Sequence, residues 1–312
     1  MKEIRYHLMF GVWYLLSLLP LWILYRISDL LCPIVHYIVH YRRNVIRTNL
    51  KESFPDKTDK ELRIIERNFY RFFCDYIVET VKLFSMSRRT LRRRMRFEGT
   101  ELFTKAFEEE NKNFCFIYLG HYGNWEWIAS LPYALPPDIL CAQIYHPLWS
   151  PVFDRLFLRL RNRFGGLCIP MKLTLRRIIQ LKQKRQRTIV GFISDQLPNW
   201  NSMHFFLPFL NHPDTPVFTG TEQIGRQMDA AFFFAHISRP RRGRYVCTFT
   251  RMHTPEQKTE DFPQTTLFTR MLEQMINEQP AYWLWSHKRW KRTKAEWLLR
   301  TQKGTNQPTP QS

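Results

Sequence analysis

The 312-residue sequence contains few cysteines, and none of them is arranged as a metal site or a redox motif. There is no C-x-x-C pair, and the six cysteines are scattered along the chain at Cys32, Cys74, Cys115, Cys141, Cys168 and Cys247. Scattered cysteines are typical of a reducing, cytosolic compartment, so we expect neither disulfide bonds nor a zinc site. A glycine-rich phosphate loop and a dinucleotide-binding fingerprint are also missing from the sequence. We therefore expect no cofactor and no metal.

Acidic residues are scarce relative to basic ones. The 27 Asp and Glu residues face 47 Lys and Arg residues, which gives a formal net charge of +20. This excess is larger than solubility requires and indicates an anionic partner: nucleic acid, anionic lipid or an acidic carrier protein. Aromatic residues make up 15% of the chain, and aromatic side chains are favoured at membrane interfaces. Charge and aromatic content together favour an anionic membrane surface.

The N-terminal region contains the longest uncharged run. Residues 8–25 form eighteen consecutive uncharged positions, which just reaches the length of a membrane-spanning helix. Pro20 would kink a helix there, and basic residues flank the apolar region on both sides, so a re-entrant hairpin or a shallow interfacial anchor fits better than a single pass. A buried core helix is the alternative. We predict a membrane-anchoring segment over residues 1–50, an α/β domain over 51–303 and a disordered tail over 304–312.

After this segment, short apolar runs alternate with helical patterns. The predicted strands cover residues 113–119, 139–145, 188–194, 230–237 and 244–250. The predicted helices cover residues 56–84, 124–134, 151–164, 172–186 and 216–228. Alternating strands and helices predict an α/β fold with a mostly parallel central sheet flanked by helices.

The sequence GHYGNWEW, residues 120–127, places a histidine and a glutamate five positions apart. His121 follows a predicted strand, and ligands of α/β sheets gather at the carboxyl ends of strands. On one regular helix, at about 100° per residue, His121 and Glu126 would lie roughly 140° apart. They can pair only if His121 lies in the turn before the helix and Glu126 in its first turn, a turn that Gly120 and Gly123 permit. The alternative is a structural histidine followed by an ordinary helix-start glutamate.

A paired carboxylate would fix the tautomer of the imidazole. With one ring nitrogen bonded to Glu126, the other nitrogen of His121 would be free to remove a proton from a hydroxyl group. The motif then predicts a general base, His121, that Glu126 orients.

Read with four later blocks, GHYGNWEW resembles the bacterial lipid A biosynthesis acyltransferases, within the wider glycerolipid acyltransferase group that carries an H-x4-D/E motif. The later blocks contain an R-x-R element at Arg161 and Arg163, the triplet Ser194-Asp195-Gln196, the T-G-T at 219–221, and an aromatic and basic block at 283–290. The resemblance covers the chain to about residue 292. Two departures stand out: YGNWE follows His121 as in diverse members of the group, and Ser194 replaces a proline.

The resemblance implies transfer of a fatty acyl chain from an acyl-carrier-protein thioester to a hydroxyl group of a lipid A precursor. It places the enzyme at the bacterial inner membrane with its catalytic domain on the cytoplasmic side. It implies that His121 takes the hydroxyl proton, that Glu126 orients it, and that Arg161 or Arg163 stabilises the oxyanion or holds a phosphate. The remaining residues expected to contact substrate are Asp195, Gln196 and Asn124. Coenzyme A remains open as the donor.

Two alternatives keep part of this interpretation. The acceptor could instead be a lysophospholipid, an amino acid lipid or another glycolipid, although the F-P-E-G-T block typical of lysophosphatidate acyltransferases does not occur. A non-catalytic, basic membrane-surface or nucleic-acid-binding protein is the alternative of a different class. Its basic clusters would be residues 88–96, 182–187 and 239–244, but these lack a recognised nucleic-acid module, so we expect no nucleic-acid partner.

Overall fold

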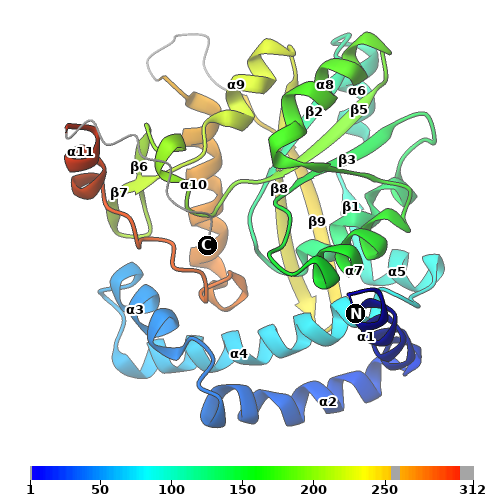
Figure 1. Ribbon diagram of the computed structural model, residues 1–312. Helices are drawn as coiled ribbons and strands as arrows, with labels where there is room; N and C mark the ends of the chain where they lie inside the picture. The colour runs from blue at the N-terminus through cyan, green and yellow to red at the C-terminus, as the bar shows by residue number, and fades with distance from the viewer. Residues whose placement is uncertain (1, 254–260, 303–312) are drawn as a thin grey trace.

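The computed structural model describes residues 2–253 and 261–302, and in this part the chain builds one large sheet with helices around it (Figure 1). The sheet has seven strands in the order β1-β9-β8-β2-β5-β3-β4. Their bounds are β1 Met95–Glu98, β2 Phe114–Leu119, β3 Leu140–Tyr145, β4 Leu167–Pro170, β5 Thr188–Ile193, β8 Ala231–Arg241 and β9 Arg244–Arg251. A separate antiparallel pair is formed by β6 Phe206–Phe209 and β7 His212–Pro216. The predicted tail, 304–312, lies outside the described residues.

The predicted fold class is confirmed. Neighbouring strands of the large sheet are parallel, except for β8 and β9, which form an antiparallel hairpin. All five predicted strands are present as β2, β3, β5, β8 and β9. The sequence did not reveal β1 and β4, because each has only four residues and neither shows a long apolar run.

Helices cover both faces of the sheet. Beyond the N-terminal region they are α3 Arg43–Ser53, α4 Asp59–Lys82, α5 Arg88–Arg94, α6 Glu101–Glu108, the 3₁₀ helix η2 Trp125–Ala134, α7 Pro151–Asn162, α8 Thr174–Gln183, α9 Gly220–Gln227, α10 Pro263–Glu278 and α11 Lys294–Gln302. Short 3₁₀ turns are η3 Met171–Leu173, η4 Trp200–Ser202 and η5 Pro280–Tyr282. The predicted helix over 124–134 is therefore a 3₁₀ helix, and that over 216–228 begins later, at Gly220.

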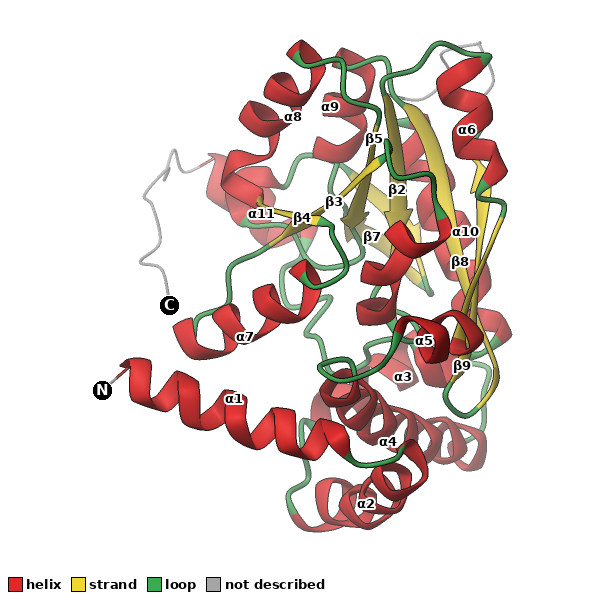
Figure 2. Cartoon of the chain, turned by 90° about the vertical axis from the view of Figure 1, so that its right-hand side faces the viewer, coloured by secondary structure: helices red, strands yellow, loops and turns green. Residues whose placement is uncertain are grey.

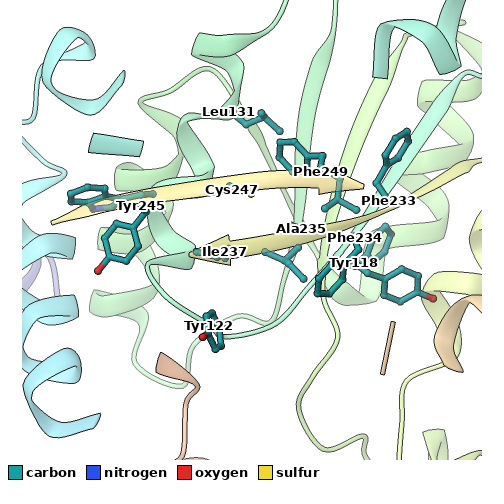
Figure 3. Packing of buried hydrophobic residues seen from close by; sticks show 14 of the residues in the cluster. Tyr118, Tyr122, Leu131, Phe233, Phe234, Ala235, Ile237, Tyr245, Cys247 and Phe249 are labelled. Carbon is teal, nitrogen blue, oxygen red and sulfur yellow. The ribbon is translucent and has the colours of Figure 1, made fainter. Parts of the chain in front are cut away.

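Alternating side chains of β8 face opposite layers of the core. Phe233 meets Phe103 of α6 with ring centroids 4.7 Å apart, while the next residue, Phe234, meets Phe268 of α10. Successive residues of a strand point to opposite faces, so α6 and α10 lie on opposite sides of the sheet. Figure 3 shows the buried side chains of β8 and β9, with Tyr118 of β2 beside Phe234.

The N-terminal region forms two helices. They are α1 Lys2–Leu18 and α2 Leu21–Pro33, and α2 continues into a π-helical turn, η1 Ile34–Ile38. Pro20 precedes the first residue of α2 and separates the helices, so the uncharged run 8–25 is not one helix. By length and composition, Leu21–Ile38 is the one helix in the described part of the chain that could cross a membrane, and 22% of it is buried.

The helices α2 and α4 lie side by side at one end of the molecule (Figures 1 and 2). The Ser28 hydroxyl of α2 donates to Asp75 of α4 at 2.7 Å, and the Tyr25 hydroxyl donates to Glu79 of α4 at 2.9 Å. Asp75 and Glu79 are buried, so leaving their carboxylates unpaired would be costly, and these bonds hold α2 against α4.

A capping box at Thr58 starts α4, which supports both α2 and the site described below. The Thr58 side chain accepts from the Glu61 backbone N–H, and the Glu61 carboxylate accepts from the Thr58 backbone N–H. We expect Thr58→Ala to lower the free energy of unfolding by about 1 kcal/mol. The Glu61 backbone N–H would lose its acceptor, and the bond from the backbone N–H of residue 58 to Glu61 would lose the geometry of the capping box. Urea unfolding of the detergent-solubilised protein measures this change. Lys60→Ala, in the same exposed turn, is the control and is expected to change it by less than about 0.5 kcal/mol. Equal effects of the two substitutions would contradict the capping role.

Candidate active site

The carboxyl ends of β2 and β5 bring His121 and Asp195 together. These strands are parallel neighbours, and their last residues, Leu119 and Ile193, lie opposite each other in the register. His121 and Asp195 each follow by two residues, so equal offsets from one sheet edge place them side by side. The imidazole Nδ1 of His121 lies 2.7 Å from Asp195 Oδ1, and the His121 backbone N–H donates to Asp195 Oδ2 at 2.9 Å.

Two glycines allow the chain to turn between β2 and the helix η2. Gly123 has φ +57°, and a Cβ at this position would lie 2.7 Å from Ile237 Cγ2. A Cβ at Gly120 would lie 2.8 Å from Leu272 Cδ1 and 3.5 Å from Asp195 Oδ2. The predicted turn is therefore present, with His121 before the helix and Glu126 in its first turn.

A segment near the C-terminus completes the surroundings of Asp195. The indole N–H of Trp283 donates to Asp195 Oδ2 at 2.8 Å, and the Leu284 backbone N–H donates to the His121 carbonyl at 3.1 Å. Tyr122 and Trp283 also form an isolated antiparallel bridge. Trp283 was not among the predicted site residues. The signal that could have revealed it is chemical, because a buried indole N–H requires an acceptor.

Asp195 is held in its charged form. Burial alone would raise the pKa of its carboxyl group, but the charge of His121, the two bonds from His121 and the bond from Trp283 outweigh burial and lower the pKa to about 2. A carboxylate that accepts several N–H bonds favours its ionised state in this way. A charged Asp195 accepts the proton on Nδ1 and so leaves Nε2 of a neutral His121 as the basic nitrogen.

Gln196 lies beside that basic nitrogen. Its side-chain Nε2 is 3.3 Å from His121 Nε2, so the amide can donate to the imidazole lone pair. The His121 side chain is 19% exposed and that of Asp195 only 2%, so His121 is the solvent-accessible member of the pair.

Glu126 does not contact the imidazole, so the predicted pairing of His121 with Glu126 is wrong. The Glu126 carboxylate is almost fully buried and binds Arg161 through two bonds, Nη2 to Oε1 at 2.6 Å and Nε to Oε2 at 2.9 Å. Burial opposes the charge of Arg161, but the Glu126 carboxylate raises the pKa of the guanidinium above its usual value. Trp125, the residue before Glu126, places its ring 5.2 Å from the imidazole in an edge-to-face contact.

Asn124 and Arg163 have structural partners, and the structure corrects the prediction that Asn124 contacts substrate. Asn124 is fully buried; its Nδ2 donates to Glu79 at 2.7 Å, and its Oδ1 accepts from the Trp127 backbone N–H at the start of η2. Arg163 donates to the Met86 carbonyl at 3.2 Å. Of the two arginines in the R-x-R element, Arg161 is therefore the one that binds Glu126 of the GHYGNWEW segment.

Two further basic residues of the C-terminal block lie near Asp195, the buried Arg289 and the partly buried His287. Burial lowers the pKa of His287 to about 4, which keeps this imidazole neutral, and lowers the pKa of Arg289 to about 10. The Asp195 carboxylate favours the charged form of both groups. Within residues 2–253 and 261–302, no three His, Cys, Asp or Glu side chains are grouped as metal ligands would be, and the expectation that no metal is bound stays a prediction.

The depressed pKa of Asp195 predicts how stability depends on pH. A carboxyl group with a folded-state pKa of about 2 and an unfolded-state value of 3.8 stabilises the fold above pH 4 by about 2 kcal/mol. This contribution is lost as the pH falls from about 4 to about 2. We expect Asp195→Asn to lower the unfolding free energy at neutral pH, and the gap to the parent protein to shrink over that interval.

Denaturant unfolding of the detergent-solubilised protein at a series of pH values measures this gap. Asp56→Asn, an exposed aspartate, is the matched control and should leave the pH dependence unchanged. Parallel curves for the parent protein and Asp195→Asn would contradict the assignment of Asp195 as a stabilised carboxylate.

One protein family matches most of the chain. Residues 1–292 match the profile of the family described as bacterial lipid A biosynthesis acyltransferase. No curated protein matches the chain in sequence. The match includes the N-terminal helices, both buried ion pairs and the segment that carries Trp283.

Proposed function

Because the chain belongs to the bacterial lipid A biosynthesis acyltransferase family and is an acyltransferase, we propose that it moves a fatty acyl chain from an acyl-carrier-protein thioester to a hydroxyl group of a lipid A precursor. The family is membrane-associated in bacteria, and we place this enzyme on the cytoplasmic side of the inner membrane. The observation that carries the proposal is the buried His121–Asp195 pair at the edge of the sheet.

In the proposed mechanism, His121 is the general base and Asp195 orients it. Nε2 removes the proton of the acceptor hydroxyl as its oxygen attacks the thioester carbonyl carbon, and a tetrahedral intermediate forms. The carbon–sulfur bond then breaks, and the leaving thiolate takes the proton back from Nε2. The products are an ester and a free thiol, and His121 returns to its neutral state. Gln196, whose amide lies at Nε2, would be displaced by the entering hydroxyl group.

Arg161 supplies positive charge to the same site. The bonds to Glu126 use Nε and Nη2 of Arg161. Among the described residues Nη1 has no hydrogen-bond acceptor, so it would be available to an oxygen of the substrate. A preorganised cation in a dry site stabilises the oxyanion of the intermediate or a substrate phosphate. Glu126 acts through Arg161 in this scheme, so it is a positioning residue and not the partner of the base.

The cationic surface is consistent with a carrier-protein donor. The net charge of +20 favours an acidic carrier protein, which would be attracted over a longer range than a small thioester. Assays of the purified enzyme that offer acyl carrier protein and coenzyme A thioesters test the donor. The acceptors to compare are a lipid A precursor, a lysophospholipid and an unrelated glycolipid. Transfer only to the lysophospholipid would overturn the proposed acceptor.

His121→Ala is expected to lower kcat at least about 100-fold, since a general base contributes on the order of 10²–10⁴ to the rate. Initial rates of ester formation with saturating donor measure this loss. His236→Ala is the control, because this partly exposed histidine pairs with Glu278 and has no contact with the catalytic pair. A near-parental rate for His121→Ala would remove the basis of the proposed chemistry.

A double-mutant comparison separates the roles of Asp195 and Glu126. If Asp195 acts only through His121, adding Asp195→Asn to His121→Ala should cause little further loss of kcat. Adding Glu126→Gln to His121→Ala should cause a further loss of roughly tenfold, because Arg161 would lose its positioning carboxylate. If Glu126→Gln instead causes no further loss of kcat in the His121→Ala background, Glu126 acts through the imidazole and not through Arg161.

A further inference from the structure

A basic pocket lies at the end of the N-terminal apolar helix. Its volume is about 340 Å³, and it is lined by His40, Arg42, Arg43, Asn44, Val45 and Arg47. These residues connect η1 to α3 and form the first turn of α3. Arg42 precedes this helix without capping it through its side chain, so the first backbone N–H groups of α3 add to the positive potential.

Two of the arginines that line the pocket share one buried carboxylate. Glu66, with 4% of its side chain exposed, accepts from Nε of Arg43 at 3.3 Å and from Nε of Arg47 at 2.9 Å. It also contacts His36, whose pKa is lowered by burial. The carboxylate therefore pairs with two of the three arginines that line the pocket, and its contacts with Arg43 and Arg47 are made through their Nε groups.

The pocket borders exposed apolar side chains of the N-terminal region. The large apolar side chains exposed along α2, η1 and the residue after η1 are Trp22 at 67%, Leu30 at 70%, Ile34 at 43%, Tyr37 at 56%, Ile38 at 72% and Val39 at 62%. The charged residues Arg26 and Asp29 of α2 are exposed between Trp22 and Leu30. An apolar face of this kind, next to a cluster of arginines, matches the boundary between lipid acyl chains and headgroups.

The contacts of α2 with α4 determine how this face can meet a membrane. The buried bonds of Ser28 and Tyr25 to Asp75 and Glu79 hold α2 against the catalytic domain. A crossing of the bilayer by Leu21–Ile38 would break these bonds and expose buried carboxylates to lipid. The helix can lie in the interface while they stay intact.

From these observations we propose that the pocket binds the phosphate headgroup of an anionic membrane phospholipid while the exposed face of α2 and η1 lies in the acyl region. Arg43 and Arg47 donate to the phosphate through their Nη groups, and the lipid chains extend along Ile34, Ile38 and Val39. This site differs from the catalytic one and does not depend on the proposed acyl transfer.

Vesicle binding of the full-length protein tests the proposal. The vesicles consist of phosphatidylcholine alone or of an equal mixture with phosphatidylglycerol. The double variant Arg43→Gln and Arg47→Gln should lower partitioning to the mixed vesicles roughly tenfold or more, because each basic residue near an anionic surface contributes on the order of 1 kcal/mol. Binding to phosphatidylcholine alone should change by less than about twofold, since neutral vesicles have no net charge to attract these arginines.

The matched control removes two charges elsewhere. Arg89→Gln and Arg93→Gln change exposed residues of the arginine-rich helix α5 and alter the net charge equally. Equal losses for the two double variants would show that bulk charge and not the pocket binds lipid, which overturns the proposal. Arg42 stays unchanged because it donates to the Ser286 carbonyl near the catalytic segment.

A single variant tests whether misfolding causes the loss of vesicle binding. Arg43→Gln keeps the bond from Arg47 to Glu66 and is expected to lower partitioning to mixed vesicles about fivefold. Acyl transfer to a detergent-dispersed acceptor should be unchanged in this variant, because no bilayer is present and neither arginine belongs to the catalytic site. A loss in both assays would place Arg43 in the folding of the site and contradict the proposed lipid contact.

Discussion

The buried carboxylate of Asp195 is the interaction on which the site depends. It accepts from the imidazole and backbone of His121 and from the indole of Trp283, so it joins the ends of β2 and β5 to a segment near the C-terminus. The Asp195 side chain is only 2% exposed, and burying a carboxylate to this extent is costly unless hydrogen-bond donors surround it. Because three donors must converge on two oxygens, the arrangement of all three segments is fixed together, and the imidazole has one favoured orientation.

A second buried carboxylate explains why the spacing of His121 and Glu126 does not produce a direct pair. The 3₁₀ helix η2 directs Glu126 to Arg161 of α7, while the turn at Gly120 directs the imidazole to Asp195. Each carboxylate thus binds one basic side chain. In the proposed mechanism this separation would position a base and a cation independently, which suits a reaction that needs both proton removal and stabilisation of negative charge.

Much of this could be predicted from the sequence, and the failures have a physical cause. The apolar runs predicted five strands, and the position of His121 after one of them correctly placed it at the carboxyl end of β2. The choice of partner could not be derived, since His121 and Asp195 are 74 positions apart and the sheet order decides that β2 and β5 are neighbours. Local spacing favoured Glu126 as the partner of His121, because spacing within one segment contains no information on Arg161 of α7, which binds the Glu126 carboxylate. Trp283 was missed for the same reason, as its acceptor lies 88 positions away.

The helix α3 links the proposed lipid pocket to the catalytic pair through hydrogen bonds. Its side chain Asn49 donates to the carbonyls of Trp285 and His287 at 2.8 and 2.9 Å, and Arg42 donates to Ser286. These carbonyls belong to the segment whose Trp283 binds Asp195. Because buried polar bonds are costly to break, α3 and this segment behave as one support. A headgroup bound in the proposed pocket would therefore be held at the start of the same helix whose Asn49 bonds to the segment that carries Trp283, so no flexible linker would separate membrane attachment from the proposed base.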